Sequence, residues 1–247
     1  AFPGVTNKLL APDVDIVFAA VPAAVEKLGA PEKTQVVGNP VRPEVFEKAG
    51  ERDAIRAQLG AGDRTVILSF GGSLGAGCIN ETMAEVIQWH TSNQLKINHI
   101  HGYGGMGKET FPKAMAAAGI PLKGDRLRIT EYINDMDVCL AAADLVICRS
   151  GASTLAELEA AGRGSILIPS PIVTGNHQFH NANVLGKAGA AIVIEQKDVT
   201  PEGIVEQVKN LYEHPEKLRS MAQHAADLAV PDTDERIYKV ISSLQKA

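Results

Sequence analysis

The sequence predicts an α/β fold, in which a doubly wound, Rossmann-like parallel sheet is covered by helices on both faces. Short runs rich in β-branched residues alternate along the chain with longer segments of helical periodicity. Most of these runs are apolar through their length, as is typical of strands buried on both faces. Short glycine-rich turns join them to the helical segments, and strand–helix–strand units of this kind are right-handed.

The predicted elements follow in order. Eight runs are expected to form strands, at residues 15–20, 35–38, 65–70, 96–101, 126–130, 144–148, 165–169 and 190–194. We expect amphipathic helices over residues 79–90, 133–143 and 180–190, and a further helix after the strand that ends at Cys148. The segment from Thr200 to the end predicts three helices separated by Pro215 and Pro231. The sheet domain therefore spans about 38–230, followed by a terminal helix at 231–247, while residues 1–37 hold too few elements for a domain.

Composition excludes several classes of protein. The chain of 247 residues has a net charge of −5 and is 4% aromatic, which argues against a nucleic-acid partner. Its cysteines, Cys78, Cys139 and Cys148, are far apart and form no CxxC pair, so we expect buried free thiols, no disulfide and no zinc. No apolar run reaches the ~18 residues of a membrane helix, so no transmembrane segment is expected. The opening "AFPGVTNKLLA" lacks a methionine, and we expect a fragment or a processed product.

In open sheets of this kind, ligands bind outside the carboxyl ends of the strands, so the turns there are the candidate sites. The segment "SFGGSLGAGCINE" follows a strand and opens a helix. Gly71, Gly72 and Gly75 would let the backbone approach a ligand, Ser73 adds a hydroxyl, and the helix start favours a phosphate. A tight turn that simply needs small residues explains the same pattern equally well.

The segment "HIHGYGGMGKE" contains a G-x-G-x-x-G pattern at Gly102, Gly104 and Gly107. The pattern resembles the dinucleotide fingerprint, but no strand ending in an acid follows at the required distance. We therefore interpret the segment as a glycine-rich surface loop. A NAD-linked oxidoreductase is kept as an alternative.

The segment "RSGASTLAELEAAG" has the T-x-x-E spacing of a capping box at Thr154 and Glu157. Taken alone, the pattern favours Glu157 as a cap in the first helical turn. The alternative is that this carboxylate accepts hydrogen bonds from a vicinal diol such as ribose.

The segment "PSPIVTGNHQFHNANVL" is dense in amides and histidines, namely Asn176, His177, Gln178, His180, Asn181 and Asn183. Amides donate and accept hydrogen bonds, which suits the neutral hydroxyls of a sugar. The two histidines lack a clear carboxylate as a third ligand, so no metal site is predicted.

Five segments in this order, together with the opening, resemble the MurG family over nearly the whole chain: "GNPVRPEVF", "GGSLGAGCIN", "ITEYINDM", "CRSGASTLAELEAAG" and "NHQFHNANVL". That family comprises bacterial transferases of peptidoglycan synthesis, which add N-acetylglucosamine (GlcNAc) from UDP-GlcNAc to an undecaprenyl-pyrophosphoryl-muramoyl-pentapeptide. The resemblance implies the C-terminal, donor-binding half of a GT-B glycosyltransferase. Residues 1–37 would then be a remnant of the N-terminal acceptor domain, to which the helix at 231–247 would cross back.

The resemblance also implies roles for particular residues. Glu157 would bind the ribose hydroxyls, Ile133 would offer its backbone to uracil, and Met136 would pack beside it. The diphosphate would lie against Ser73, the loop glycines Gly71, Gly72 and Gly75, and Thr154, with Arg42 on the same side. Gln178 and Asn181 would bind GlcNAc hydroxyls, with His177 as a further donor contact.

The same resemblance implies an inverting displacement without a metal or another cofactor. The family's G-G-T-G-G-H loop, which supplies the histidine general base, has no match here, so no catalytic residue is expected and the chain alone should bind donor without turnover. The acceptor would bind through the missing domain, and the full-length protein would be cytoplasmic and peripheral on the inner face of the cell membrane. A donor-binding subunit of a two-chain transferase and a non-catalytic UDP-sugar sensor are further alternatives.

The last helix carries an apolar stripe at Ile237, Val240, Ile241 and Leu244. We expect the stripe to be exposed, repacked or in a contact. Burial of this stripe against the chain's own sheet would contradict this expectation.

Overall fold

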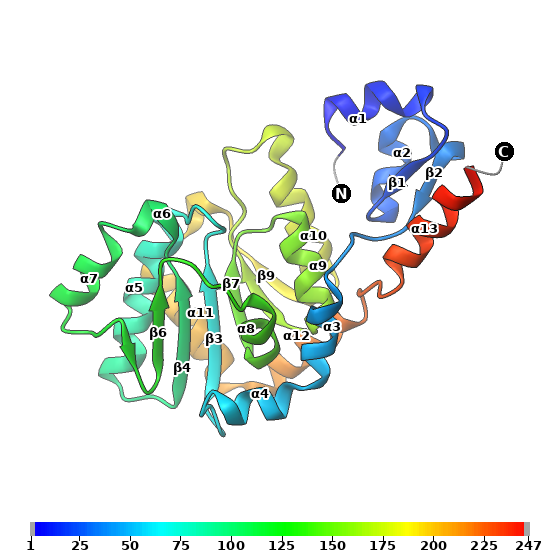
Figure 1. The fold of residues 1–247 in the computed structure, drawn as a ribbon. Helices are drawn as coiled ribbons and strands as arrows, with labels where there is room; N and C mark the ends of the chain where they lie inside the picture. The colour runs from blue at the N-terminus through cyan, green and yellow to red at the C-terminus, as the bar shows by residue number, and fades with distance from the viewer. Residues whose placement is uncertain (1–2, 245–247) are drawn as a thin grey trace.

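A computed structural model describes residues 3–244 and contains two sheets (Figure 1). The larger sheet has seven strands in the order β5-β6-β4-β3-β7-β8-β9, and all neighbours are parallel except β5 and β6. Its strands are β3 (Thr65–Phe70), β4 (Ile97–Gly102), β5 (Lys123–Gly124), β6 (Leu127–Thr130), β7 (Leu145–Cys148), β8 (Gly164–Leu167) and β9 (Ala191–Val193). The doubly wound fold is confirmed.

The eight predicted strands all occur, with ends that shift by a few residues. The prediction missed β5, because a two-residue strand is too short to contain the apolar run by which the other strands were predicted. It also missed α3 (Pro43–Gly50) and α4 (Arg52–Gln58), two short helices before β3.

Helices cover both faces of the seven-stranded sheet and divide the core in two. One face packs against α3, α4, α8 (Met136–Ala142), α9 (Ala152–Ala161) and α10 (His177–Lys187). The other packs mainly against α5 (Gly77–Ser92), α7 (Phe111–Ala117), α11 (Pro201–Glu213) and α12 (Pro215–Ala226), while α6 (Gly104–Gly107) is a single short turn after β4. Within β3, Leu68 belongs to the first cluster and Ile67 to the second, which explains why both faces of the strand carry apolar residues.

The strand order places a topological switch between β3 and β7. From β3 the chain winds outward through β4 and β6, then returns to β7 and winds the other way through β8 and β9. The loops that leave β3 and β7 therefore diverge to opposite sides of the sheet and leave a crevice between them. The two loops are residues 71–76 and 149–151.

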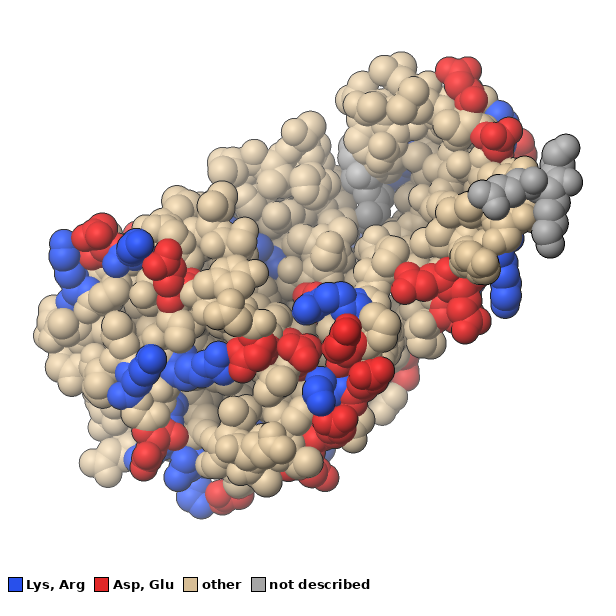
Figure 2. All heavy atoms as spheres, viewed as in Figure 1, with Lys and Arg blue, Asp and Glu red and all other residues tan. Residues whose placement is uncertain are grey.

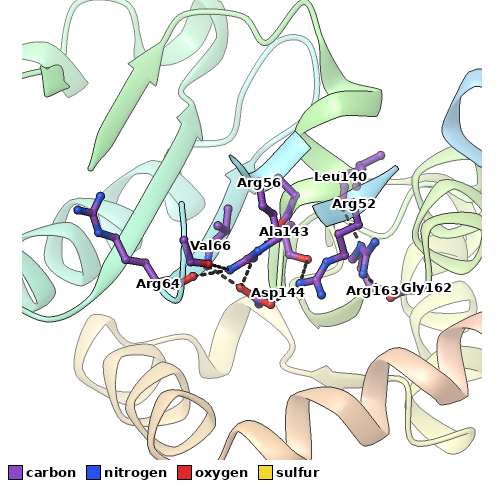
Figure 3. Close-up of polar contacts among 11 residues, drawn as sticks. Arg52, Arg56, Arg64, Val66, Leu140, Ala143, Asp144, Gly162 and Arg163 are labelled. Carbon is purple, nitrogen blue, oxygen red and sulfur yellow. Dashed lines mark hydrogen bonds and ion pairs between the residues drawn. The ribbon is translucent and has the colours of Figure 1, made fainter. Parts of the chain in front are cut away.

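At the opposite end of the sheet, Asp144 ties the starts of β3 and β7 to α4 (Figure 3). Its carboxylate accepts from the Val66 N–H at 2.8 Å and from Arg56 at 2.9 Å, and it also pairs with Arg52. The nearby Arg163 is 7% exposed, and burial lowers its pKa to about 10 while Arg52 adds repulsion. This cluster lies away from the crevice, which fits a role in holding the fold.

A chain of buried polar side chains crosses the core beneath α5. The hydroxyl of Ser69 lies 2.8 Å from His99 Nε2 and 2.8 Å from His101 Nδ1, and His90 Nε2 lies 3.2 Å from His99 Nδ1. Burial lowers the pKa of His90 to about 4 and that of His101 to about 3, and it lowers the pKa of His99 well below its usual value. These imidazoles are therefore neutral in the folded protein.

We expect acid to destabilise the fold through these histidines. The folded-state pKa values lie below the unfolded value of 6.5, so below that pH the unfolded chain binds protons that the folded chain does not. His90 and His101 would each remove about 2 kcal/mol from the unfolding free energy by about pH 5. Glu159, whose pKa burial raises to about 7, acts in the opposite direction over this range.

The contribution of His90 can be isolated by urea unfolding at about pH 7 and about pH 5. His90→Gln should lose less stability on acidification than the wild-type chain, by about 2 kcal/mol. An equal loss in both proteins would show that His90 is not held neutral by the fold.

The first residues form a small unit around the two-stranded parallel sheet of β1 (Val17–Ala19) and β2 (Thr34–Val36). It also holds α1 (Val5–Leu10) and α2 (Val25–Leu28). The chain leaves it at Gly38, where φ is +90° and an added Cβ would lie 2.5 Å from Thr233 Oγ1. The buried Thr233 hydroxyl donates to Val37 O at 2.8 Å, so the outgoing and returning segments cross in close contact here.

Helix α13 (Thr233–Leu244) starts at this crossing and, in the view of Figure 1, runs toward the small unit and away from the seven-stranded sheet. Ile237 and Val240 are half-buried, whereas Ile241 and Leu244 are exposed. None of the four belongs to either core cluster of the large sheet. The stripe is therefore not buried in the core of the seven-stranded sheet.

Candidate functional site

Two adjoining pockets open at the carboxyl ends of β3, β4 and β7, and together we name them the switch-point cleft. Their volumes are 490 and 280 Å³, and both are lined by Phe70, Gly72, Ser73 and Thr154. Within residues 3–244, no group of three or more histidine, cysteine or acidic residues has the geometry of a metal site.

The larger pocket lies between the starts of two helices. Its floor is the loop from Gly71 to Ala76, and α5 and α9 begin at Gly77 and Ala152, close to that loop. The first turns of these helices hold backbone N–H groups without helical partners, and the helix dipoles place partial positive charge there. An anionic group such as a phosphate is favoured at such a position.

The loop is held from behind by the segment that follows β4. A Cβ on Gly75, where φ is +83°, would lie 2.2 Å from Tyr103 O, and a Cβ on Gly104 would lie 2.2 Å from Gly75 N. The Met106 N–H donates to Leu74 O at 2.9 Å, and the Asn80 amide donates to Tyr103 O at 2.9 Å. The two loops thus form one rigid pair.

This packing corrects the interpretation of the G-x-G-x-x-G segment as a surface loop. Gly102, Gly104 and Gly107 are buried, and a Cβ on Gly107 would lie 2.4 Å from the Asn80 amide nitrogen. These glycines are needed because two loops approach closely, a tertiary contact that the sequence pattern does not reveal.

The smaller pocket is a slot beside the backbone of residues 131–134. Ile133 is 5% exposed and packs against Gly102, where an added Cβ would lie 3.2 Å from the isoleucine side chain. Met136 and Phe70 line the same slot. A slot whose walls combine apolar side chains with polar groups suits a planar heterocycle.

Glu157 lies in the wall of this slot, and the capping-box interpretation of it is wrong. Helix α9 begins at Ala152 after Gly151 in an extended conformation, so Thr154 is already inside the helix and makes no side-chain cap. Glu157 is consequently in the second turn. Its carboxylate lies 3.6 Å from the Arg42 guanidinium, and burial raises its pKa while Arg42 partly opposes that shift.

Arg149, which follows β7 directly, is a cleft residue that sequence reasoning missed. Its guanidinium donates to Ile168 O at 3.0 Å, to Pro169 O at 3.1 Å and to Gln196 Oε1 at 2.6 Å. No carboxylate pairs with it among the described residues, so it brings uncompensated positive charge to the larger pocket. The sequence did contain a signal for Arg149 as a site residue, because it is a charged residue directly after an apolar strand, where ligands bind in such sheets.

The structure brings most of the predicted site residues together. The cleft is lined by Arg42, Ser73, Ile133, Met136, Thr154, Glu157 and Gln178 and by the glycines Gly71, Gly72 and Gly75. Gln178 accepts from the Ser170 N–H at 2.9 Å. His177 lies outside the lining, with Nδ1 3.0 Å from Thr174 O, and the buried Asn181 lines a different pocket.

Fold and cleft together define a doubly wound α/β domain of the kind that forms the C-terminal half of GT-B glycosyltransferases. The sequence model of one protein family, the glycosyltransferase family 28 C-terminal domain, matches residues 66–237 of this chain. The chain belongs to this family.

Two curated relatives are both named UDP-N-acetylglucosamine--N-acetylmuramyl-(pentapeptide) pyrophosphoryl-undecaprenol N-acetylglucosamine transferase. The protein from Acetivibrio thermocellus is 40% identical over 247 residues, which is 100% of this chain and 65% of the relative. That from Desulfitobacterium hafniense is 41% identical over 240 residues, which is 97% of this chain and 64% of the relative. The chain therefore spans about two thirds of the length of these relatives.

Solved structures agree on the fold. MurG from Acinetobacter baumannii superimposes with a TM-score of 0.74 and 28% identity, covering 98% of this chain and 64% of that one. A putative UDP-N-acetylglucosamine 2-epimerase from Listeria monocytogenes has a TM-score of 0.69 at 19% identity, covers 97% of this chain and 62% of that one, and shows the fold alone.

Proposed function

We propose that this chain is the donor-binding part of a peptidoglycan N-acetylglucosaminyltransferase and that the switch-point cleft holds UDP-GlcNAc. One observation carries the proposal. A glycine loop between two helix starts, a base-sized slot and a half-buried carboxylate meet in one cleft, in a chain 40% identical to a transferase named for this sugar.

Each part of the donor has a matching part of the cleft. Uracil fits the slot beside Ile133 and Met136, where backbone groups can pair with its edge. The ribose hydroxyls donate to Glu157, which lies between that slot and the glycine loop. A carboxylate can accept one hydrogen bond from each of the two hydroxyls, and the negative charge of the carboxylate strengthens both bonds.

The diphosphate lies on the loop formed by Gly71, Gly72, Ser73 and Gly75, with Thr154 at its side. Positive charge comes from the starts of α5 and α9 and from the guanidiniums of Arg42 and Arg149. The sugar then extends toward Gln178 at the far end of the larger pocket.

Two of the predicted sugar contacts, His177 and Asn181, do not line the switch-point cleft. His177 lies on the loop outside the cleft lining, and Asn181 faces another pocket. The sugar contact therefore depends on Gln178 in this proposal.

In the proposed reaction, a hydroxyl of the acceptor sugar attacks the anomeric carbon of GlcNAc, the bond to the diphosphate breaks, and the configuration inverts. This chain would stabilise the negative charge that develops on the departing UDP through the helix starts and arginines described above. We assign the general base and the lipid-linked acceptor to the part of the longer relatives that this chain does not match. Exposed apolar residues on the small unit, Val5, Leu9 and Leu10, offer a surface for that part.

We place the full-length enzyme at the cytoplasmic face of the cell membrane, where a lipid-linked acceptor would be reached. No helix in the described part of the chain is long and apolar enough to span a bilayer. Charged side chains of both signs are interspersed over the face seen in Figure 2, which favours a small-molecule ligand over nucleic acid.

Calorimetric titration of the chain with UDP-GlcNAc, UDP-glucose and NADH tests the proposal. We expect UDP-GlcNAc to bind more tightly than UDP-glucose and NADH not to bind, because Gly102, Gly104 and Gly107 are occupied in loop packing. Binding of NADH without binding of UDP-GlcNAc would favour the oxidoreductase instead.

A further inference from the structure

A pocket of 480 Å³ lies where the small unit meets the large domain, and we name it the junction pocket. Its walls combine apolar side chains of both parts, among them Val21, Val36, Phe46, Leu155, Val184 and Val230. It shares no lining residue with the switch-point cleft. Its size is in the range of pockets that hold small organic ligands.

Among residues 3–244, Glu159 is the one charged residue that lines this pocket. It stands two positions after Glu157 on α9, and because successive residues turn by about 100°, the two side chains leave the helix on nearly opposite sides. Glu157 faces the switch-point cleft, whereas Glu159 faces the junction pocket.

The Glu159 carboxylate makes no hydrogen bond or ion pair with any described residue. Burial alone raises its pKa to about 7, and no neighbouring charge contributes to that shift. An ionised carboxylate in apolar surroundings loses hydration that nothing on the protein replaces. The helix would be more stable with an apolar residue at this position.

We propose that the junction pocket binds a compact apolar molecule that carries one protonated amine, with the ammonium paired to Glu159. The apolar body would fill the walls contributed by Val21, Phe46 and Leu155, and the ammonium would replace the lost hydration of the carboxylate. A ligand with a carboxylate would be repelled, and a neutral one would leave Glu159 unpaired. Because the walls come from both parts of the chain, the ligand would also hold the small unit against the large domain.

Three probes with one hydrocarbon cage test this proposal by calorimetry: 1-aminoadamantane, 1-adamantanol and adamantane-1-carboxylate. At about pH 8.5, where Glu159 is ionised and the amine protonated, we expect the amine to bind about tenfold more tightly than the alcohol. The carboxylate should bind more weakly than the alcohol. At about pH 5.5 Glu159 takes up its proton, so the preference for the amine should shrink.

Glu159→Gln keeps the size of the side chain and removes its charge, so it should make the amine and the alcohol bind equally. Glu213→Gln, which removes an exposed carboxylate at the end of α11, is the matched control and should keep the preference. Absence of binding by all three probes, equal binding of amine and alcohol to the wild-type chain, or a preference that survives in Glu159→Gln would each overturn the proposal. Competition between the amine and UDP would also overturn it, because the two pockets share no residue.

Discussion

Glu157→Ala should weaken the binding of UDP-GlcNAc by about 100-fold, because two charge-assisted hydrogen bonds to the ribose are lost together. The carboxylate is half-buried in the wall of the slot, and its raised pKa shows that it already lacks some of the hydration it would have in water. In the proposed complex, ribose hydroxyls would replace that hydration and so favour the bound state. Calorimetric titration of both proteins at about pH 8, where the carboxylate is ionised, measures the difference.

The nucleotide itself supplies the sharpest control. In the wild-type chain, 2′-deoxy-UDP should bind about tenfold more weakly than UDP, whereas Glu157→Ala should bind the two nearly equally. Glu213→Ala removes an exposed acid elsewhere and should leave both affinities unchanged. A deoxy penalty that persists in Glu157→Ala would show that another group binds the ribose.

Gly75→Ala should separate the loop that forms the floor of the larger pocket from the segment after β4 that packs behind it. A Cβ here would lie 2.2 Å from Tyr103 O, and the backbone has a φ of +83° that side chains rarely adopt. We expect a loss of about 2–4 kcal/mol in the free energy of unfolding, together with at least about a tenfold loss of UDP affinity. Urea unfolding and calorimetry measure the two effects separately.

Gly105→Ala is the matched control for this change. Gly105 lies on the neighbouring loop, but its Cβ would meet nothing within 4 Å and its φ is not positive. Its stability and affinity should stay close to those of the wild-type chain. If Gly75→Ala bound UDP as the wild-type chain does, the glycine loop would not be the floor of the nucleotide site.

Most of the fold follows from local sequence. The largely apolar runs at β3 and β7 predicted strands buried on both faces, because a parallel sheet between two helix layers leaves no face exposed to water. The start of α9 could not be predicted from the T-x-x-E spacing, because Gly151 takes an extended conformation and begins the helix three residues before the position that a Thr154 cap requires. Loop-to-loop contacts such as Gly75 with Gly104 are tertiary and leave no local signal.

The sequence predicted the site residues well where they share one loop. It predicted them less well on a helix, where the face that a side chain occupies determines which pocket it lines. The glycines of the loop after β3 and Glu157 lie in the cleft as the family resemblance implied. In α10, however, polar residues occur on several faces, and the pattern could not show that Gln178 lines the cleft while Asn181 lines the junction pocket. Arg149 was missed because the glycine and the acid that follow it form the more recognisable local pattern.

A crystal structure of the chain with UDP would show whether the switch-point cleft is the nucleotide site. We predict uracil in the slot beside Ile133, ribose oxygens within hydrogen-bonding distance of the Glu157 carboxylate, and the diphosphate on the loop from Gly71 to Gly75. Arg42 should have moved from the carboxylate, from which it now lies 3.6 Å away, toward the phosphates. A nucleotide found in the junction pocket, or one whose ribose lies away from Glu157, would contradict the account.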